Sequence, residues 1–184
     1  MCSTGGHAGE VDCGERSSTV GVMPSWRLSD RTLELAQPIG AGIVNVTTDS
    51  MYEGARSGTP ERAVIDGLAL VEAGFDMLDV GAVAARSGPA VSPENEAAQL
   101  VPAITGLAGR AEVPVSADTF QPEVAVAAAR AGAAAINDIG GGGDAMLEAV
   151  AETGCGYVLM HLEGPPRQDR ARPGYDDVVE RLKA

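Results

Sequence analysis

Aromatic side chains are scarce in this chain. They make up 3% of its 184 residues, whereas 45% are hydrophobic. Such a composition indicates a core of Ala, Val, Leu and Ile, at a length typical of one domain. No apolar run approaches the roughly 20 residues of a membrane-spanning helix. The N-terminus also lacks the basic-then-apolar order of a secretory signal. We therefore expect a cytoplasmic protein.

The chain is also poor in basic residues and in cysteine. It has 13 Lys and Arg against 26 Asp and Glu, a net charge of −13. So acidic a surface repels nucleic-acid phosphates and anionic lipid, and we expect neither as a partner. The three cysteines, Cys2, Cys13 and Cys155, form no Cys-x-x-Cys pair. Neither a disulfide framework nor a structural zinc site is predicted.

Residues 1–25 are rich in Gly, Ser and charge and have no hydrophobic periodicity, so we predict a disordered tail. Residues 26–184 are expected to form one domain. It begins with two short alternating runs, Trp26–Leu28 and Thr32–Leu35, which predict a small hairpin.

From Ile39 onward, strand and helix patterns alternate, with short connections. Five apolar runs each end in polar residues, and the segments between them carry helix-start signals such as a capping hydroxyl followed by proline. Helices are predicted to begin at Thr59–Glu61, Ser92–Glu94, Gln121–Glu123, Asp144 and Asp176–Asp177, and the first four to end near Gly74, Gly109, Gly132 and Gly154.

Such alternation predicts an α/β fold with a parallel sheet. A doubly wound nucleotide-binding sheet would carry Gly-x-Gly-x-x-Gly after its first strand, but Asn45–Thr48 follows instead. In a (β/α)₈ barrel, polar residues from many strands meet at one face, as this pattern requires. A full barrel takes about 250 residues and eight strands. We therefore predict an incomplete barrel with about five of the eight βα units.

The first strand region, Gly42–Ser50 (GIVNVTTDS), resembles the first signature of the dihydropteroate synthases, usually Gly-Ile-Leu-Asn-Val-Thr-Pro-Asp-Ser. The resemblance extends in order over residues 26–182. It implies a (β/α)₈ barrel and a transferase of folate biosynthesis that joins hydroxymethyl-dihydropterin diphosphate to p-aminobenzoate with the help of Mg²⁺. The other matching blocks are Asp79–Gly81, Val115–Thr119, Ile136–Ile139, Leu159–His161 with Gly164 and Pro166, and Tyr175–Val178.

The resemblance also implies a pterin site. A pterin edge with adjacent donors and acceptors calls for a carboxylate and a carboxamide, which Asp118 and Asn137 would supply from neighbouring strands. Ile139 and Met160 would form apolar walls for the flat ring. Asp79 is assigned to the same substrate site. No catalytic nucleophile is assigned, because the mechanism needs none.

The diphosphate end of the substrate has two expected partners. Asn45 offers a neutral oxygen to Mg²⁺, a hard cation that keeps its waters and shares substrate phosphate oxygens. Arg86 is expected to hold the diphosphate.

Each of these residues, taken alone, has a simpler interpretation. The order and spacing of the five blocks favour the functional one. The simpler roles are backbone capping for Asp118 or Asp138, a turn for Asn45, core packing for Met160, a structural role for His161, a solvated charge for Arg86 and a flexible connector for Gly140–Gly143.

The second loop departs most from the family pattern. Gly81–Gly88 reads GAVAARSG, where the usual run is Gly-Gly-Glu-Ser-Thr-Arg-Pro-Gly, so Ala84 and Ala85 replace two hydroxyl residues. Losing a hydrogen bond to a charged group costs roughly 1.5–3 kcal/mol. The family's site residues on strands six to eight would follow Ala184. We therefore expect no turnover by this chain alone, and a homodimer or a complementing C-terminal fragment as partner.

Two other functions stay open. One is a non-catalytic pterin-binding relative, which the alanine-containing loop allows. The other is a methyltetrahydrofolate-handling methyltransferase domain, against which the diphosphate-linked Asn45 and Arg86 argue.

Overall fold

The computed structural model describes residues 23–47, 57–84, 88–162, 164, 166–167 and 174–183. Its centre is a five-stranded parallel sheet in the order β3-β4-β5-β6-β7. The strands are β3 (Ala41–Asn45), β4 (Met77–Gly81), β5 (Val115–Asp118), β6 (Ala135–Asp138) and β7 (Gly156–Leu159), and the helices are α1 (Pro60–Glu72), α2 (Pro93–Ala108), α3 (Pro122–Arg130), α4 (Asp144–Thr153) and α5 (Val178–Lys183).

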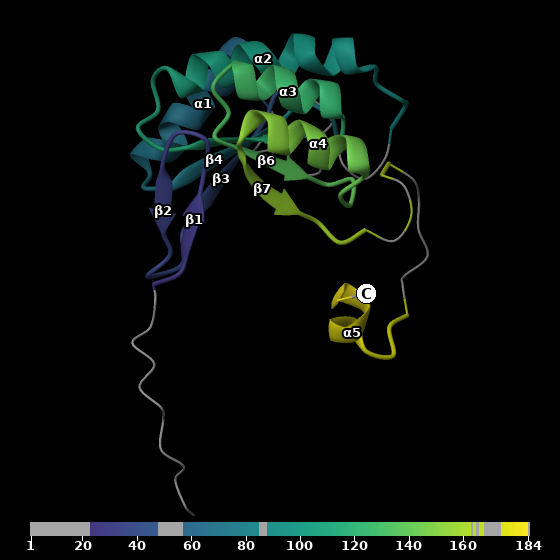
Figure 1. The fold of residues 1–184 in the computed structure, drawn as a ribbon. Coiled ribbons are helices and arrows are strands. Elements are labelled where there is room, and N and C mark those ends of the chain that lie inside the picture. Colours follow the sequence, from purple (N-terminus) through teal and green to yellow (C-terminus); the bar gives the residue numbers. More distant parts are fainter. Residues whose placement is uncertain are drawn as a thin grey trace, which may run out of the picture.

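Helices α1 to α4 all lie on one face of the sheet, and α5 is set apart from it (Figure 1). A doubly wound sheet would carry helices on both faces, whereas a barrel carries them only on its outside. The predicted incomplete barrel of five βα units is therefore confirmed.

The helices begin where their caps place them. Thr59 and Ser92 accept hydrogen bonds from the backbone N–H groups of Arg62 and Asn95, at 3.2 and 3.3 Å. The sequence also indicates Asp144 as the cap of the fourth helix, but Gly143 is its N-cap and Asp144 is its first helical residue. At that position the negative charge of the Asp144 side chain is stabilised by the positive end of the helix dipole, although the side chain makes no capping hydrogen bond.

The core lies between the helices and the sheet. Val44, Leu78, Val80 and Ile136 on the strands pack with Leu100, Ile104 and Leu107 on α2. Two glycines allow α1 and α2 to approach closely, because a Cβ at Gly67 would lie 2.8 Å from Leu107 and one at Gly106 would lie 2.6 Å from Val64.

The predicted hairpin is confirmed as β1 (Ser25–Arg27) paired antiparallel with β2 (Thr32–Glu34). Trp26, Leu28 and Leu33 pack against Ala134 and Ala135 at the start of β6. The hairpin therefore covers the amino ends of the last strands and leaves the carboxyl ends of the sheet open.

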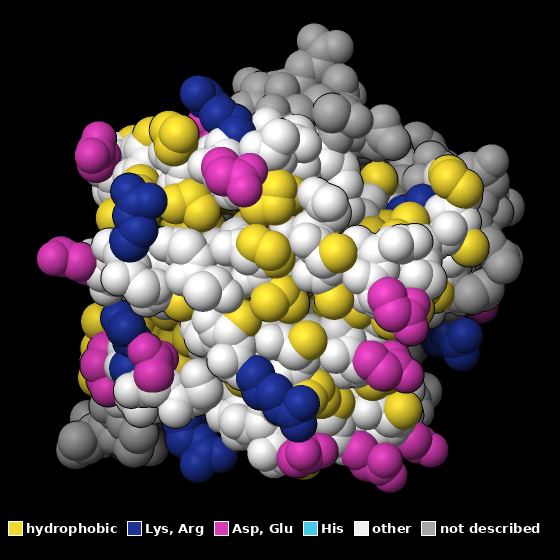
Figure 2. Space-filling view, turned by 90° about the horizontal axis from the view of Figure 1, so that it is seen from above, with side chains coloured by type: hydrophobic (Ala, Val, Ile, Leu, Met, Phe, Trp, Pro, Cys, Tyr) yellow, Lys and Arg dark blue, Asp and Glu magenta, His cyan; other side chains and the backbone are white. Residues whose placement is uncertain are grey.

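Seen from above, the helical layer shows hydrophobic side chains scattered among charges of both signs (Figure 2). Among the described residues, no helix is long and apolar enough to cross a membrane.

Candidate functional site

Five residues form one row across the inner face of the sheet, the face without helices. Asn45, Gly81, Asp118, Asn137 and Val158 are successive register partners on β3 to β7. Each of them is the last residue of its strand or the last but one. Three of the residues predicted to contact the substrate or metal are thus brought together at the carboxyl rim.

A second row lies two residues earlier on each strand, because side chains alternate between faces. Asp79 belongs to this row, with Ser116 beside it on β5. Asp79 accepts a hydrogen bond from the Ser116 hydroxyl at 2.6 Å and one from the Asn137 side-chain amide at 2.9 Å. Asp79 therefore orients Asn137. Sequence patterns place Ser116 in a strand but give no sign of this contact.

Burial raises the pKa of Asp79 above its usual range, and the hydrogen bonds from Ser116 and Asn137 partly lower it. These donors stabilise the charged form of a carboxylate that has little access to solvent.

Asp118 supplies the carboxylate of the first row, and its pKa is strongly perturbed. Burial raises its pKa to about 7, and the negative charges of Asp79, Glu96 and Asp138 add to the effect. Its Oδ1 atom is buried and has no hydrogen-bond partner within the described part of the chain. A ligand that donates a hydrogen bond would satisfy this atom and favour its ionised form.

Asn45 ends β3 and is half-buried. Its backbone carbonyl accepts from Ser57, at 2.8 Å, and its side-chain amide has no hydrogen bond within the described ranges. Those ranges hold no group of three His, Cys, Asp or Glu residues able to bind a metal. One neutral side-chain oxygen at Asn45 fits a cation that takes most of its oxygens from water and substrate, as Mg²⁺ does.

Ile139 and Met160 lie beyond the same strand ends. Ile139 is buried and comes two residues after Asn137; Met160 is half-buried and comes two residues after Val158. The Met160 N–H donates to the carbonyl of Asp138 at 3.1 Å, which ties the end of β7 to β6.

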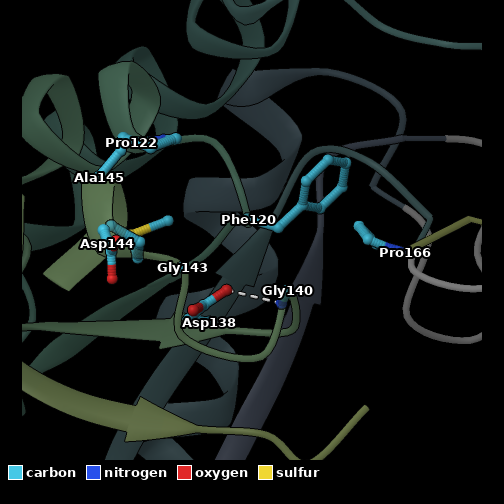
Figure 3. A pocket seen from close by; sticks show the side chains of 9 residues that line it. Phe120, Pro122, Asp138, Gly140, Gly143, Asp144, Ala145 and Pro166 are labelled. Atoms are coloured by element: carbon cyan, nitrogen blue, oxygen red, sulfur yellow. Dashed lines mark hydrogen bonds between the residues drawn. The ribbon is translucent and has the colours of Figure 1, made fainter. Parts of the chain in front are cut away.

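Asp138 serves the adjacent connector. Its buried carboxylate accepts from the N–H group of Gly140 at 2.6 Å (Figure 3). It also accepts from the N–H group of Gly142 at 2.9 Å and from the Tyr157 hydroxyl at 2.7 Å. Burial, reinforced by Asp138, raises the pKa of Tyr157. Asp138 is thus the backbone cap that the simpler interpretation described. The hydrogen bond from the Tyr157 hydroxyl to Asp138 was not predicted from the sequence.

A cavity of about 350 Å³ lies at the starts of α3 and α4, where Phe120 and Pro166 face each other (Figure 3). Asp138 lines it, but Asn45, Asp118 and Asn137 do not. We assign the candidate site to the row, because Asn45, Asp118 and Asn137 bring hydrogen-bonding groups from three strands to it.

One predicted site residue falls outside the described part of the chain, and one residue for which a structural role was expected lies away from the row. Arg86, with Ala85, lies outside the described residues. His161 is exposed and lies 3.2 Å from the Tyr175 hydroxyl, so it does not join the row.

Comparison with known proteins was made by sequence and by structure. The family described as pterin binding enzyme matches residues 41–184. The dihydropteroate synthase of Escherichia coli (strain K12) is 40% identical over 149 residues, which are 80% of this chain and 53% of that protein. The inactive dihydropteroate synthase 2 of Mycobacterium leprae is 38% identical over 167 residues, 85% of this chain and 55% of that one.

A solved structure of Xanthomonas albilineans dihydropteroate synthase with 4-aminobenzoic acid superposes with a TM-score of 0.73 at 41% identity. The match covers 87% of this chain and 57% of that structure. The chain spans about half the length of the curated relatives it matches.

Proposed function

The chain belongs to the pterin binding enzyme family, and we propose that within it this is a dihydropteroate synthase-like transferase of folate biosynthesis. In the proposed reaction, the bond between the pterin methylene carbon and the diphosphate oxygen breaks and diphosphate leaves. The amine of p-aminobenzoate then forms a C–N bond to that carbon and loses a proton.

The observation that carries this proposal is the buried Oδ1 of Asp118, which lies beside Asn137 and has no hydrogen-bond partner among the residues that the structure describes. The amino-pyrimidinone edge of a pterin has donors for the carboxylate and complementary groups for the carboxamide. Asp79 fixes the Asn137 amide at 2.9 Å and so presents it in one orientation. Ile139 and Met160 supply the apolar surface for the ring.

We assign the diphosphate end to Asn45 and Arg86. Asn45 would hold Mg²⁺ through its side-chain oxygen, and the ion supplies positive charge to the departing diphosphate. The protein contributes mainly position and charge complementarity, since the reaction needs no covalent intermediate on a side chain.

We place further βα units of the barrel against β7, in the same protein, a complementing fragment or a second copy. Val158 and Leu159 on this edge strand are 41% and 58% exposed. An uncovered parallel edge with apolar side chains favours such pairing. A cytoplasmic location and one domain over residues 26–184 belong to the same proposal.

A second candidate function is pterin binding without catalysis. Ala84 stands where the family pattern has a hydroxyl residue, and one relative of similar identity is named inactive. Loss of a hydrogen bond to the diphosphate would reduce the turnover rate more than it would reduce the affinity for the pterin.

Calorimetry with hydroxymethyl-dihydropterin diphosphate, with and without Mg²⁺, tests both candidates when paired with a dihydropteroate assay. We expect Asp118→Ala and Asn137→Ala to weaken binding at least tenfold, by removing a hydrogen bond to a buried polar edge. The exposed Asn95→Ala is the control. Unchanged affinity in both site variants would remove them from the pocket, and binding without product would favour the non-catalytic relative.

A further inference from the structure

Glu96, on α2, is a buried acid that contacts the turn between β5 and α3. It is 1% exposed, and its Oε2 accepts a hydrogen bond from the side-chain amide of Gln121. Gln121 is the N-cap residue of α3, but its side chain makes no capping hydrogen bond. Its amide binds Glu96 instead, so the carboxylate of Glu96 is held against this turn.

Hydrogen bonds continue from this contact toward the two residues proposed to bind the pterin edge. The backbone N–H of Gln121 donates to the Thr119 hydroxyl at 3.2 Å, and the backbone N–H of Thr119 donates to the carbonyl of Asn137 at 3.1 Å. Thr119 is buried and directly follows Asp118. Glu96 is therefore fixed, through one short turn, to the strand ends that carry Asp118 and Asn137.

The surroundings of Glu96 favour its negative form. Burial raises its pKa, whereas the Thr119 hydroxyl, the Gln121 amide and the charge of Arg167 lower it. Its second oxygen, Oε1, is buried and has no hydrogen-bond partner among the described residues. A carboxylate in such a setting is poorly screened by water, so its charge extends to neighbouring groups.

Asp118 is the group on which this charge acts. Burial raises its pKa to about 7, and so do the charges of Asp79 on β4, Glu96 on α2 and Asp138 on β6. Asp79 orients Asn137, and Asp138 holds the connector after β6, so neither can be changed without disturbing the site. Glu96 lies on a helix outside the row, so its charge can be removed without changing a residue assigned to the ligand.

We propose that Glu96 is a positioning residue that acts on the pterin through Asp118: fixed against the turn after β5, its negative charge weakens pterin binding in mild acid. The inference rests on the proposed function, which assigns pterin binding to Asp118. A proton on Asp118 competes with the hydrogen-bond donors of the pterin, and a negative charge nearby favours that proton.

The test measures the affinity of the full chain for hydroxymethyl-dihydropterin without diphosphate, by calorimetry from pH 5.5 to pH 8. Glu96→Gln removes the charge but keeps the size of the side chain and an acceptor for Gln121. We expect binding about threefold or more tighter than in wild type at pH 6, because each unit by which the ionisation of Asp118 moves to lower pH gives about tenfold there. At pH 8, where Asp118 has lost its proton in both proteins, the two affinities should be equal.

Glu94→Gln is the matched control, because it makes the same exchange at an exposed position of the same helix. Its affinity should follow that of wild type at every pH. A profile of Glu96→Gln that coincides with wild type would overturn the proposal. So would a profile lowered equally at every pH, which is the result of a purely structural defect.

Carbon-13 NMR of the side-chain carboxyl groups gives a second readout on the wild-type chain, which does not depend on how the variant folds. The signal of Asp118 should change at the pH where Glu96 titrates as well as at its own. An Asp118 signal that does not respond at that pH would overturn the proposal. If wild type binds no pterin, the proposed function fails, whereas the coupled titration still supports the effect of Glu96 on Asp118.

Discussion

Gly81 and Asp118 are partners on adjacent strands, and the missing side chain at Gly81 leaves room for the carboxylate. A Cβ at Gly81 would lie 3.2 Å from Asp118 Oδ2, closer than ordinary van der Waals contact. The space at Gly81 therefore sets the position of the carboxylate proposed to bind the pterin.

Replacing Gly81 with valine tests this relationship. We expect Gly81→Val to push the Asp118 carboxylate aside and weaken pterin binding at least tenfold, with roughly 1–3 kcal/mol of lost stability from overpacking. Calorimetry and urea denaturation measure the two effects. Gly109→Val is the control, because the nearest atom to a Cβ there is 3.5 Å away. Full pterin affinity in Gly81→Val would show that the carboxylate does not need this space.

The affinity for pterin should depend on pH through Asp118. Its pKa of about 7 in the unliganded protein means that below pH 7 most molecules carry a proton that pterin donors must displace. Affinity should therefore rise from pH 5.5 to pH 8, by up to about tenfold per unit on the acid side, and binding should release a proton near pH 6.

Calorimetry in two buffers of different ionisation enthalpy measures this proton release. In Asp118→Asn, which cannot ionise, the slope should largely disappear. A wild-type affinity that does not change between pH 5.5 and pH 8 would contradict the role of Asp118.

Removing the Asn45 side chain should reduce the response to Mg²⁺. In Asn45→Ala we expect most of the Mg²⁺-dependent gain in diphosphate affinity to be lost, because the side-chain oxygen proposed to hold the ion is gone. Affinity for hydroxymethyl-dihydropterin without diphosphate should stay the same. Titrations at several Mg²⁺ concentrations measure the change, and an unaltered Mg²⁺ response would reject the metal role.

Tyr157→Phe should destabilise the fold by about 1.5 kcal/mol, because Asp138 keeps its two backbone donors but loses the hydroxyl. Tyr175→Phe is a matched control, since in the described part of the chain its hydroxyl contacts the exposed ring of His161. Urea denaturation should separate the two variants. Equal stability of both would show that the Tyr157 hydroxyl adds nothing.

The sequence was informative about the ends of strands and helices, because period-two runs, caps and prolines are local signals. The row of Asn45, Asp118 and Asn137 follows from polar residues placed at the ends of parallel strands. Contacts that depend on lateral register were not foreseen, such as those of Ser116 and Asn137 with Asp79. Register is set by packing against distant helices, not by the residues of a strand alone.

Long-range contacts of loops could likewise not be predicted from the sequence. Arg167 reads as one charge among several in a polar segment, and only the fold brings it to Ala84 and Pro89. The Gly140–Gly143 run suggested a flexible connector, but the Asp138 carboxylate holds it by accepting hydrogen bonds from two of its backbone N–H groups.

On every strand, side chains alternate between the face that carries the row and the face that packs in the core. An insertion or deletion within a strand therefore affects both faces. Deleting one residue of β5 before Ala117 would turn the Ala117 side chain to the face that carries the row. The Asp118 side chain would then point into the layer where Val80 and Ile136 pack. Binding groups and core would be lost together. Insertions and deletions should therefore accumulate in the connections between strands and be purged from the strands themselves.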